Sequence, residues 1–222
     1  FNVISSYRDR MEPLLQFYEP LQDEYGFIGR MGVWGFAPSW ATTQWPDKKG
    51  TPAYAQMMLY LNYKIGAEFA GKWGDKKLVK YYRKQAETLK VSILKHFWNE
   101  EKGLFINGYK ENGERDEGVS HHAQYWAILA GLFPEDRYDN LFETLPDIPD
   151  YKANVRYEKG YEFLAYSKAG KVEQMWDFLF SVFGDWLEQG HTRFPEKFSY
   201  LKSKDEQLVF FSRSYGFCLL YT

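Results

Sequence analysis

Two kinds of helical segment alternate along this chain, and that alternation constrains the fold more than any other feature of the sequence. Between Thr51 and Gly74, apolar residues step by three or four positions, and the other faces of the segment are also largely apolar, so this helix is expected to be buried nearly all round. Residues 76–97 keep the same step, but their opposite face carries Lys, Arg, Gln and Glu, which is typical of an outer helix. The stepping residues are Tyr54, Met58, Leu61, Ile65 and Phe69 in the first segment, and Val79, Tyr82, Ala86, Leu89, Ile93 and Phe97 in the second.

Local signals mark the ends of these two helices. Thr51 followed by Pro52 is typical of an N-cap with proline in the first turn. Gly74 predicts the end of the first helix, and Asp75 predicts the N-cap of the second. The pair therefore forms an α-hairpin with an inner and an outer member.

The same alternation recurs further along the chain, again with glycines at the expected ends. Alternating inner and outer helices without a short sequence repeat favour a toroid of hairpins over an open solenoid. We therefore predict an all-α fold in a single domain over residues 1–222. The further segments are 119–131 (ending at Gly131) with the shorter polar partner 135–144, then 156–169 (ending at Gly170) with 171–187, and a last helix from about 206 to the end.

The connections between these helices are too long to be simple turns. Residues 20–50 carry Tyr25, Phe27, Trp34, Phe36, Trp40 and Trp45 among Gly, Pro and Thr. Residues 103–115 predict a small β-hairpin insertion, with Glu-Asn-Gly-Glu at its turn. In a ring of hairpins one set of loops gathers at one rim, and functional residues are expected there.

Composition excludes several classes of partner and site. The formal charge is −2 and the 28 basic residues are scattered, so nothing indicates a nucleic-acid partner. No apolar run approaches the roughly 20 residues that a membrane span needs. The single cysteine, Cys218, excludes an internal disulfide framework and a cysteine-based zinc site. Aromatic residues make up 20% of the chain, which is more than a core needs and leaves some for a stacking surface in the loops.

One carboxylate stands out in the stretch from Gly190 to Phe198. Glu196 lies between two phenylalanines and beside Arg193 and Lys197, on a loop after a long amphipathic helix. Aromatic rings stack on sugars, and a carboxylate activates water in sugar hydrolysis. The alternative is a solvated loop glutamate.

Four ordered stretches resemble the catalytic (α/α)6 domain of bacterial α-L-rhamnosidases and their relatives. They are residues 51–98, residues 101–105 with 120–132, residues 157–170, and residues 190–196, in which the glutamate follows a turn glycine by six positions. The resemblance implies an inverting hydrolysis in which Glu196 is the general base. It also implies a carbohydrate substrate, and such a hydrolysis needs neither a metal nor an organic cofactor.

The chain also departs from the family pattern. Arg193 and Pro195 stand where the family usually has Thr and Trp, and no Asp-Trp pair accompanies Trp40 in the aromatic loop. The acidic cluster that includes the family's general acid would precede residue 1. We therefore expect an incomplete toroid, its latter part, with further parts of the same polypeptide or further domains missing.

Several other residues are candidates for substrate binding. Trp34, Trp40 and Trp45 are either walls of a sugar subsite or a loop core, and Asp47 either orients a sugar hydroxyl or begins a turn. Arg193 either binds a carboxylate-bearing sugar or pairs with Glu196 and lowers its pKa. Tyr157 matches a family tyrosine but fits a core position equally well.

His121 and His122 begin the helix predicted after residue 119. Neighbouring residues point about 100° apart on a helix, so the pair does not form the i, i+4 arrangement that favours a metal. Either one histidine donates to a sugar hydroxyl, or the pair is a capped helix start with one ring buried and one exposed. Asp116 and Glu117, just before them, are the nearest candidates for a second carboxylate.

Together these features predict a glycosidase of α-L-rhamnosidase type that removes a terminal sugar with inversion. Two alternatives stay open: a carbohydrate-binding relative that has lost catalysis, and a helical scaffold for protein partners. A periplasmic or secreted location is favoured over the cytoplasm only because enzymes that degrade polysaccharides are often exported.

Overall fold

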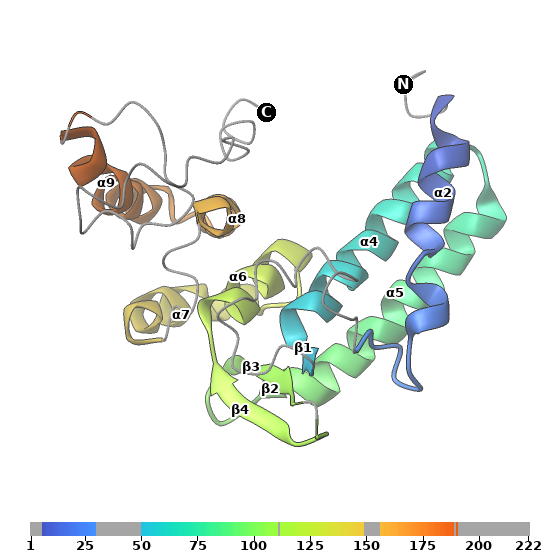
Figure 1. The fold of residues 1–222 in the computed structure, drawn as a ribbon, viewed down its shortest axis with the longest axis horizontal. Helices are drawn as coiled ribbons and strands as arrows, with labels where there is room; N and C mark the ends of the chain where they lie inside the picture. The colour runs from blue at the N-terminus through green and yellow to red at the C-terminus, as the bar shows by residue number, and fades with distance from the viewer. Residues whose placement is uncertain (1–5, 30–49, 111, 149–155, 189, 191–222) are drawn as a thin grey trace, which may run out of the picture.

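The computed structural model describes residues 6–29, 50–110, 112–148, 156–188 and 190, and the fold is mostly helical with a small antiparallel sheet (Figure 1). Among these residues no helix is both long and apolar enough to cross a membrane. The helices are α2 (Arg8–Gln16), α4 (Ala53–Lys72), α5 (Lys76–Phe97), α6 (His121–Ala130), α7 (Tyr138–Thr144), α8 (Arg156–Lys168) and α9 (Val172–Glu188), with short 3-10 turns at Glu19–Leu21, Glu135–Arg137 and Leu145–Asp147. The strands are β1 (Thr51–Pro52), β2 (Trp98–Asn99), β3 (Leu104–Tyr109) and β4 (Arg115–Val119).

Helices α4 and α6 lie side by side and run in the same direction. Near their N-terminal ends the ring of Tyr54 lies 5.8 Å from that of His122. Further along both helices, Lys64 Nζ donates to the carbonyl of Ala130 at 3.4 Å. In both contacts the two residues lie at similar distances from the N-terminal ends of their helices. The N-terminal ends of α4 and α6 therefore face the same side of the molecule.

Helix α8 continues this parallel row on the other side of α6. His121 in the first turn of α6 contacts Glu162 in the second turn of α8. At the opposite end, Lys168 Nζ donates to the carbonyl of Leu129 at 2.7 Å. The row α4–α6–α8 corresponds to the three segments predicted as inner helices.

The intervening helices pack outside this row. Helix α5 packs along α4, and α9 packs along α8 (Figure 1). Helix α7 contacts α8 through the ring of Phe142, which lies 4.6 Å from that of Tyr166. The outer character predicted for residues 76–97 is confirmed, because the buried residues of α5 are the predicted stripe of Tyr82, Ala86, Leu89, Ile93 and Phe97.

The predicted helix ends are largely confirmed. Each of the four glycines expected to end a helix or form the following turn has a φ between +73° and +76°, a left-handed conformation that glycine adopts without steric cost. Asp75 caps α5 by accepting from the Leu78 amide at 3.0 Å. Thr51 is not the N-cap of α4, because Thr51 and Pro52 form strand β1 and the helix begins at Ala53. The four glycines are Gly74, Gly131, Gly170 and Gly190.

The small sheet lies at the N-terminal ends of α4 and α6. Strands β3 and β4 form the predicted hairpin, with Gly108 opposite Asp116 and Ile106 opposite Val119. Strands β1 and β2 also pair with β3, and these two-residue pairings were not predicted. The prediction of a helical fold with a small β-hairpin insertion is thus confirmed, and it is extended by strands β1 and β2, which make the hairpin part of a sheet of four short strands.

A buried glutamine repeats at the fourth position of two inner helices. Gln56 of α4 exchanges hydrogen bonds of 2.9 and 2.8 Å with the backbone N–H and C=O of Ile28. Gln124 of α6 makes the same pair with Phe105, at 3.0 and 2.7 Å. Each glutamine thereby holds one extended residue against the start of its helix, so the two hairpin units share a structural repeat.

Candidate functional site

The N-terminal ends of α4, α6 and α8 bring polar and aromatic side chains together at one end of the row. Tyr54 comes from the first turn of α4, His121 and His122 from the first turn of α6, and Glu162 from the second turn of α8. Helix N-termini carry partial positive charge and unpaired N–H groups, which favour negative charge nearby. This end of the row is therefore the natural place for a carboxylate.

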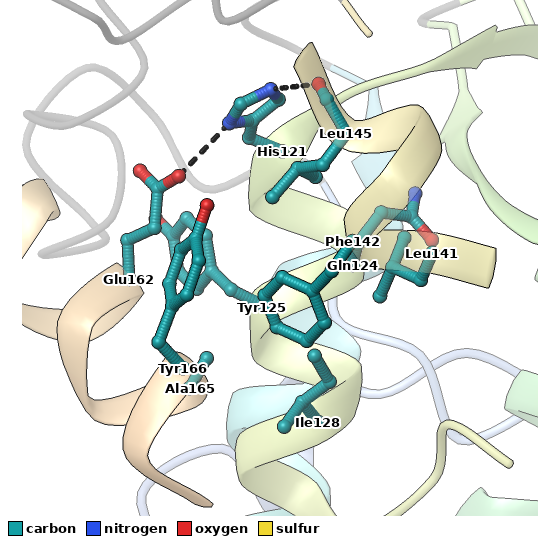
Figure 2. Close-up of a pocket in the computed structure, with 10 residues that line it drawn as sticks. All are labelled: His121, Gln124, Tyr125, Ile128, Leu141, Phe142, Leu145, Glu162, Ala165 and Tyr166. Carbon is teal, nitrogen blue, oxygen red and sulfur yellow. Dashed lines mark hydrogen bonds and ion pairs between the residues drawn. The ribbon is translucent and has the colours of Figure 1, made fainter. Parts of the chain in front are cut away.

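His121 is held on both sides of its ring (Figure 2). Its Nδ1 lies 3.0 Å from Glu162 Oε1, and its Nε2 lies 2.8 Å from the carbonyl oxygen of Leu145. The Glu162 side chain is only 3% exposed. One histidine thus connects α6, the turn after α7, and α8.

The acceptors around His121 fix where protons lie. A carbonyl oxygen only accepts, so Nε2–H donates to Leu145. Between Nδ1 and Glu162 there is one proton: an imidazolium donates to a carboxylate, or a carboxylic acid donates to a neutral ring. The pair is neutral in total in either case, which makes its burial tolerable.

A cavity beside this pair is too small for a sugar. It has a volume of about 10 Å³ and is closed by apolar side chains of α6, α7 and α8, with the His121–Glu162 pair at its polar end (Figure 2). A space of this size holds one water molecule at most. This cavity is therefore not a sugar site, and within it His121 and Glu162 join α6 to α8.

His122 lies in the core, 1% exposed, with its ring 5.8 Å from that of Tyr54 and 5.2 Å from that of Tyr125. The side chain of His121 is 11% exposed. The alternative of one buried and one exposed histidine is therefore wrong. Contact of either ring with a sugar hydroxyl stays a prediction.

The two acidic residues before α6 have different surroundings. Glu117 is exposed and lies 3.1 Å from Arg115 Nε and 3.1 Å from Asn99 Nδ2, so it contributes to the surface of the sheet. Asp116 is half-buried and accepts from the amide of Gly118 at 3.0 Å and from Asn107 Nδ2 at 3.4 Å. Of these two carboxylates, Asp116 is the one that contacts a buried polar residue of the hairpin, Asn107.

Two buried polar atoms near Asp116 have no hydrogen-bond partner within the described part of the chain. They are Asn107 Oδ1 and Ser120 Oγ, from residues that are 1% and 0% exposed. Buried polar atoms without partners are costly and are uncommon away from functional sites. Ser120 directly precedes α6, and Asn107 lies on β3, which pairs with the strand that leads into this helix.

Most of the predicted site residues lie outside the described residues. Tyr157 lies in the first turn of α8, but its side chain is not described. In the described ranges no group of three or more His, Cys, Asp or Glu side chains is arranged to hold a metal ion. The roles of all these residues stay predictions, and those outside the described residues are Trp34, Trp40, Trp45, Asp47, Arg193 and Glu196.

Glu162 was not among the predicted site residues, although the sequence contains a signal for it. Residues 162, 165, 166 and 169 are spaced so that they lie on one helical face. Glu162 occupies a position on this face where an apolar residue is expected. A carboxylate in such a register must have a polar partner in another element. The sequence alone did not show that this partner is His121.

Comparison with solved structures supports the same fold. A rhamnosidase from Klebsiella oxytoca with rhamnose bound superposes with a TM-score of 0.70 at 18% identity, over 89% of this chain and 39% of the rhamnosidase. A GH78 family rhamnosidase of Bacillus sp. GL1 superposes with a TM-score of 0.75, also at 18% identity, over 96% of this chain and 22% of that enzyme. The chain therefore spans well under half the length of either enzyme.

A family relationship comes from the sequence. No curated protein matches the chain. A family model does match, over residues 8–158, which include the described inner helices α4 and α6 and the hairpin between them. The expected likeness to rhamnosidase-type hydrolases is confirmed, and the chain belongs to the mannosylglycerate hydrolase MGH1-like glycoside hydrolase domain family.

Proposed function

We propose that this chain is the latter part of an (α/α)6 toroid that hydrolyses a terminal sugar from a glycan or glycoside, with inversion. The observation that carries the activity is the match to a glycoside hydrolase domain family over residues 8–158. The likeness to two rhamnosidases supports an α-L-rhamnoside as the first substrate to test.

The arrangement of helices supports the toroid. Three inner helices that contact one another in the order α4, α6 and α8, each followed by an outer helix, are the arrangement expected for part of such a ring. The chain covers 39% and 22% of the two rhamnosidases, so the remaining hairpins are expected from other parts of the polypeptide. The catalytic rim is then the end at which α4, α6 and α8 begin.

In the proposed mechanism Glu196 deprotonates a water molecule that attacks the anomeric carbon. A second carboxyl group, which we expect upstream of residue 1, protonates the leaving oxygen. Inverting hydrolysis places the two carboxyl groups about 6.5–9.5 Å apart, with room for the water between them. Trp34, Trp40 and Trp45 would hold the sugar, while the His121–Glu162 pair joins the first turn of α6 to the second turn of α8.

A second candidate substrate is an anionic glycoside. The description of the family names a mannosylglycerate hydrolase, and glycerate carries a carboxylate. Arg193, which replaces the usual threonine, offers a guanidinium that pairs with a carboxylate in a bidentate way. A charged aglycone would explain this departure from the rhamnosidase pattern.

A substrate screen with the full-length gene product tests the proposal. The panel contains 4-nitrophenyl α-L-rhamnoside, the corresponding mannoside and glucoside, and mannosylglycerate. Turnover of the rhamnoside supports the first candidate, and preferential turnover of mannosylglycerate supports the second. Binding of sugars without turnover would instead indicate a relative that has lost catalysis. The absence of both binding and turnover would contradict the proposal.

A further inference from the structure

A cleft of about 680 Å³ opens beside the sheet, apart from the His121–Glu162 pair. It is lined by residues of the segment that follows α2, of the last turn of α5 and of the β3–β4 turn. Its volume is within the range of ligand sites in proteins, about 300–1,000 Å³. Its most informative lining residues are Asp23, Tyr25, Thr51, His96, Tyr109 and Lys110.

One wall of the cleft is an exposed aromatic ring that is held in place. Tyr25 is 45% exposed, and its ring centroid lies 4.7 Å from that of His96. His96 is fixed in turn, because its Nδ1 lies 2.9 Å from the hydroxyl of Tyr109. Tyr25 thus offers a flat apolar face whose position is set before a ligand arrives, which reduces the entropy lost on binding.

Polar groups line the cleft next to this ring. Asp23 Oδ1 accepts from the amides of Tyr25 and Phe27 at 2.9 and 2.8 Å. No partner for Asp23 Oδ2 occurs among the residues that the structure describes, so this oxygen is available to accept. Burial, with Lys95 and Arg115 nearby, lowers the pKa of His96, so its ring is neutral at pH 7 and both donates and accepts.

The charge of the cleft is low. Lys110 Nζ lies 3.2 Å from Glu114 Oε2, which offsets its charge. Asp23 is the other charged side chain of the lining. This balance disfavours a phosphate or a strongly charged peptide, and it suits a neutral ligand with many hydroxyl groups.

We propose that this cleft is a second carbohydrate-binding site, which takes a neutral sugar ring of a longer glycan. The apolar face of a pyranose would stack on Tyr25, while adjacent hydroxyl groups donate to Asp23 Oδ2 and exchange hydrogen bonds with His96 and Tyr109. This inference rests on the proposed function, since it takes the ligand class from the hydrolase family. It adds a site that the hydrolysis of a single sugar unit does not require.

The position of the cleft fits a role in holding an extended substrate. Thr51 belongs to strand β1, which precedes α4, and His96 lies in the last turn of α5, so the cleft is at the same end of the fold as the proposed catalytic rim. Gly29 and Gly50 both line it, and they flank in sequence the segment that carries Trp34, Trp40 and Trp45.

Two variants of the full-length protein test the site. Tyr25→Ala removes the stacking face, and Asp23→Asn keeps the acceptor Oδ1 that holds the turn while it replaces the accepting Oδ2 by an amide. The matched control is Tyr7→Ala, because Tyr7 is 48% exposed but lies outside the cleft. The ligand is a trisaccharide that ends in the sugar with the highest turnover or affinity in the screen, and its dissociation constant is measured in the Glu196→Gln background so that hydrolysis does not consume it.

We expect Tyr25→Ala to weaken trisaccharide binding about tenfold and Asp23→Asn several-fold. In the Glu196-containing protein, kcat/KM of Tyr25→Ala should fall about tenfold on the trisaccharide but stay within about twofold on the aryl glycoside. Equal binding by Tyr25→Ala, Tyr7→Ala and the parent would overturn the inference, even in an active hydrolase. If nothing is hydrolysed but Tyr25→Ala still weakens binding, the proposed function fails and the second site stands.

Discussion

His121 and Glu162 share one proton across a contact of 3.0 Å that joins the first residue of α6 to the second turn of α8. Because Nε2 of the same ring donates to Leu145, the ring cannot turn without loss of both contacts. The two inner helices are thereby fixed relative to each other at the end where the proposed active site lies. We therefore expect the pair to contribute to stability.

We predict different effects for two replacements of Glu162. Glu162→Ala leaves a nearly buried imidazole without its partner and should lower the free energy of unfolding by about 3 kcal/mol. Glu162→Gln should cost less than about 1 kcal/mol, because the amide N–H donates to Nδ1 of a neutral ring as a protonated Glu162 does. Urea denaturation measures both, with Glu173→Ala on the exposed surface of α9 as the control. Equal losses for Ala and Gln would contradict the shared proton.

The repeated glutamines give a second prediction. Gln124→Leu removes both hydrogen bonds to Phe105 and leaves a buried backbone N–H and C=O unpaired, which should cost about 2–5 kcal/mol. Gln56→Leu should cost a similar amount through Ile28. The exposed Gln174→Leu is the control and should change the free energy of unfolding by less than about 0.5 kcal/mol. A large loss for one glutamine and none for the other would show that the two units are not equivalent.

The lowered pKa of His96 predicts that the stability of the protein depends on pH. Burial is the main cause that lowers its pKa in the folded protein below the unfolded value of about 6.5, with Lys95 and Arg115 adding to the shift and Asp23 opposing it. Below that value the unfolded chain binds a proton that the folded protein binds less readily. The contribution of the neutral His96 ring to the free energy of unfolding is therefore fully present above about pH 6.5 and is lost as the pH falls. Between about pH 7.5 and about pH 5.5 the Tm of His96→Gln should fall less than that of the wild type, and an equal fall would contradict the assignment.

The helices could be predicted from the sequence because their signals are local. The apolar step predicted residues 76–97 as a helix, and α5 spans Lys76–Phe97. Residues 156–169 and 171–187 correspond to α8 and α9 to within a few residues. Left-handed glycines follow α8 and α9, at Gly170 and Gly190, and their conformational preference does not depend on the rest of the fold.

The partners of buried polar residues could not be predicted in the same way. Gln56 bonds to a residue 28 positions away, and His121 to one 41 positions away. Strand β1 forms only because β3 lies beside it, and a Thr-Pro start signal is equally typical of a helix N-terminus. The periodicity of one segment does not specify which other segment its polar side chains will meet.

The central claim is that Glu196 is the base of an inverting glycoside hydrolase, and one comparison tests it most directly. The rate of hydrolysis and the anomeric form of the first product are measured by NMR for the full-length protein, for Glu196→Gln and for the surface control Glu173→Gln. We predict that the wild type and the control release the inverted anomer at similar rates. Glu196→Gln should bind the same sugar but lose at least about a hundredfold in kcat. Full activity in Glu196→Gln, or a product with retained configuration, would contradict the account.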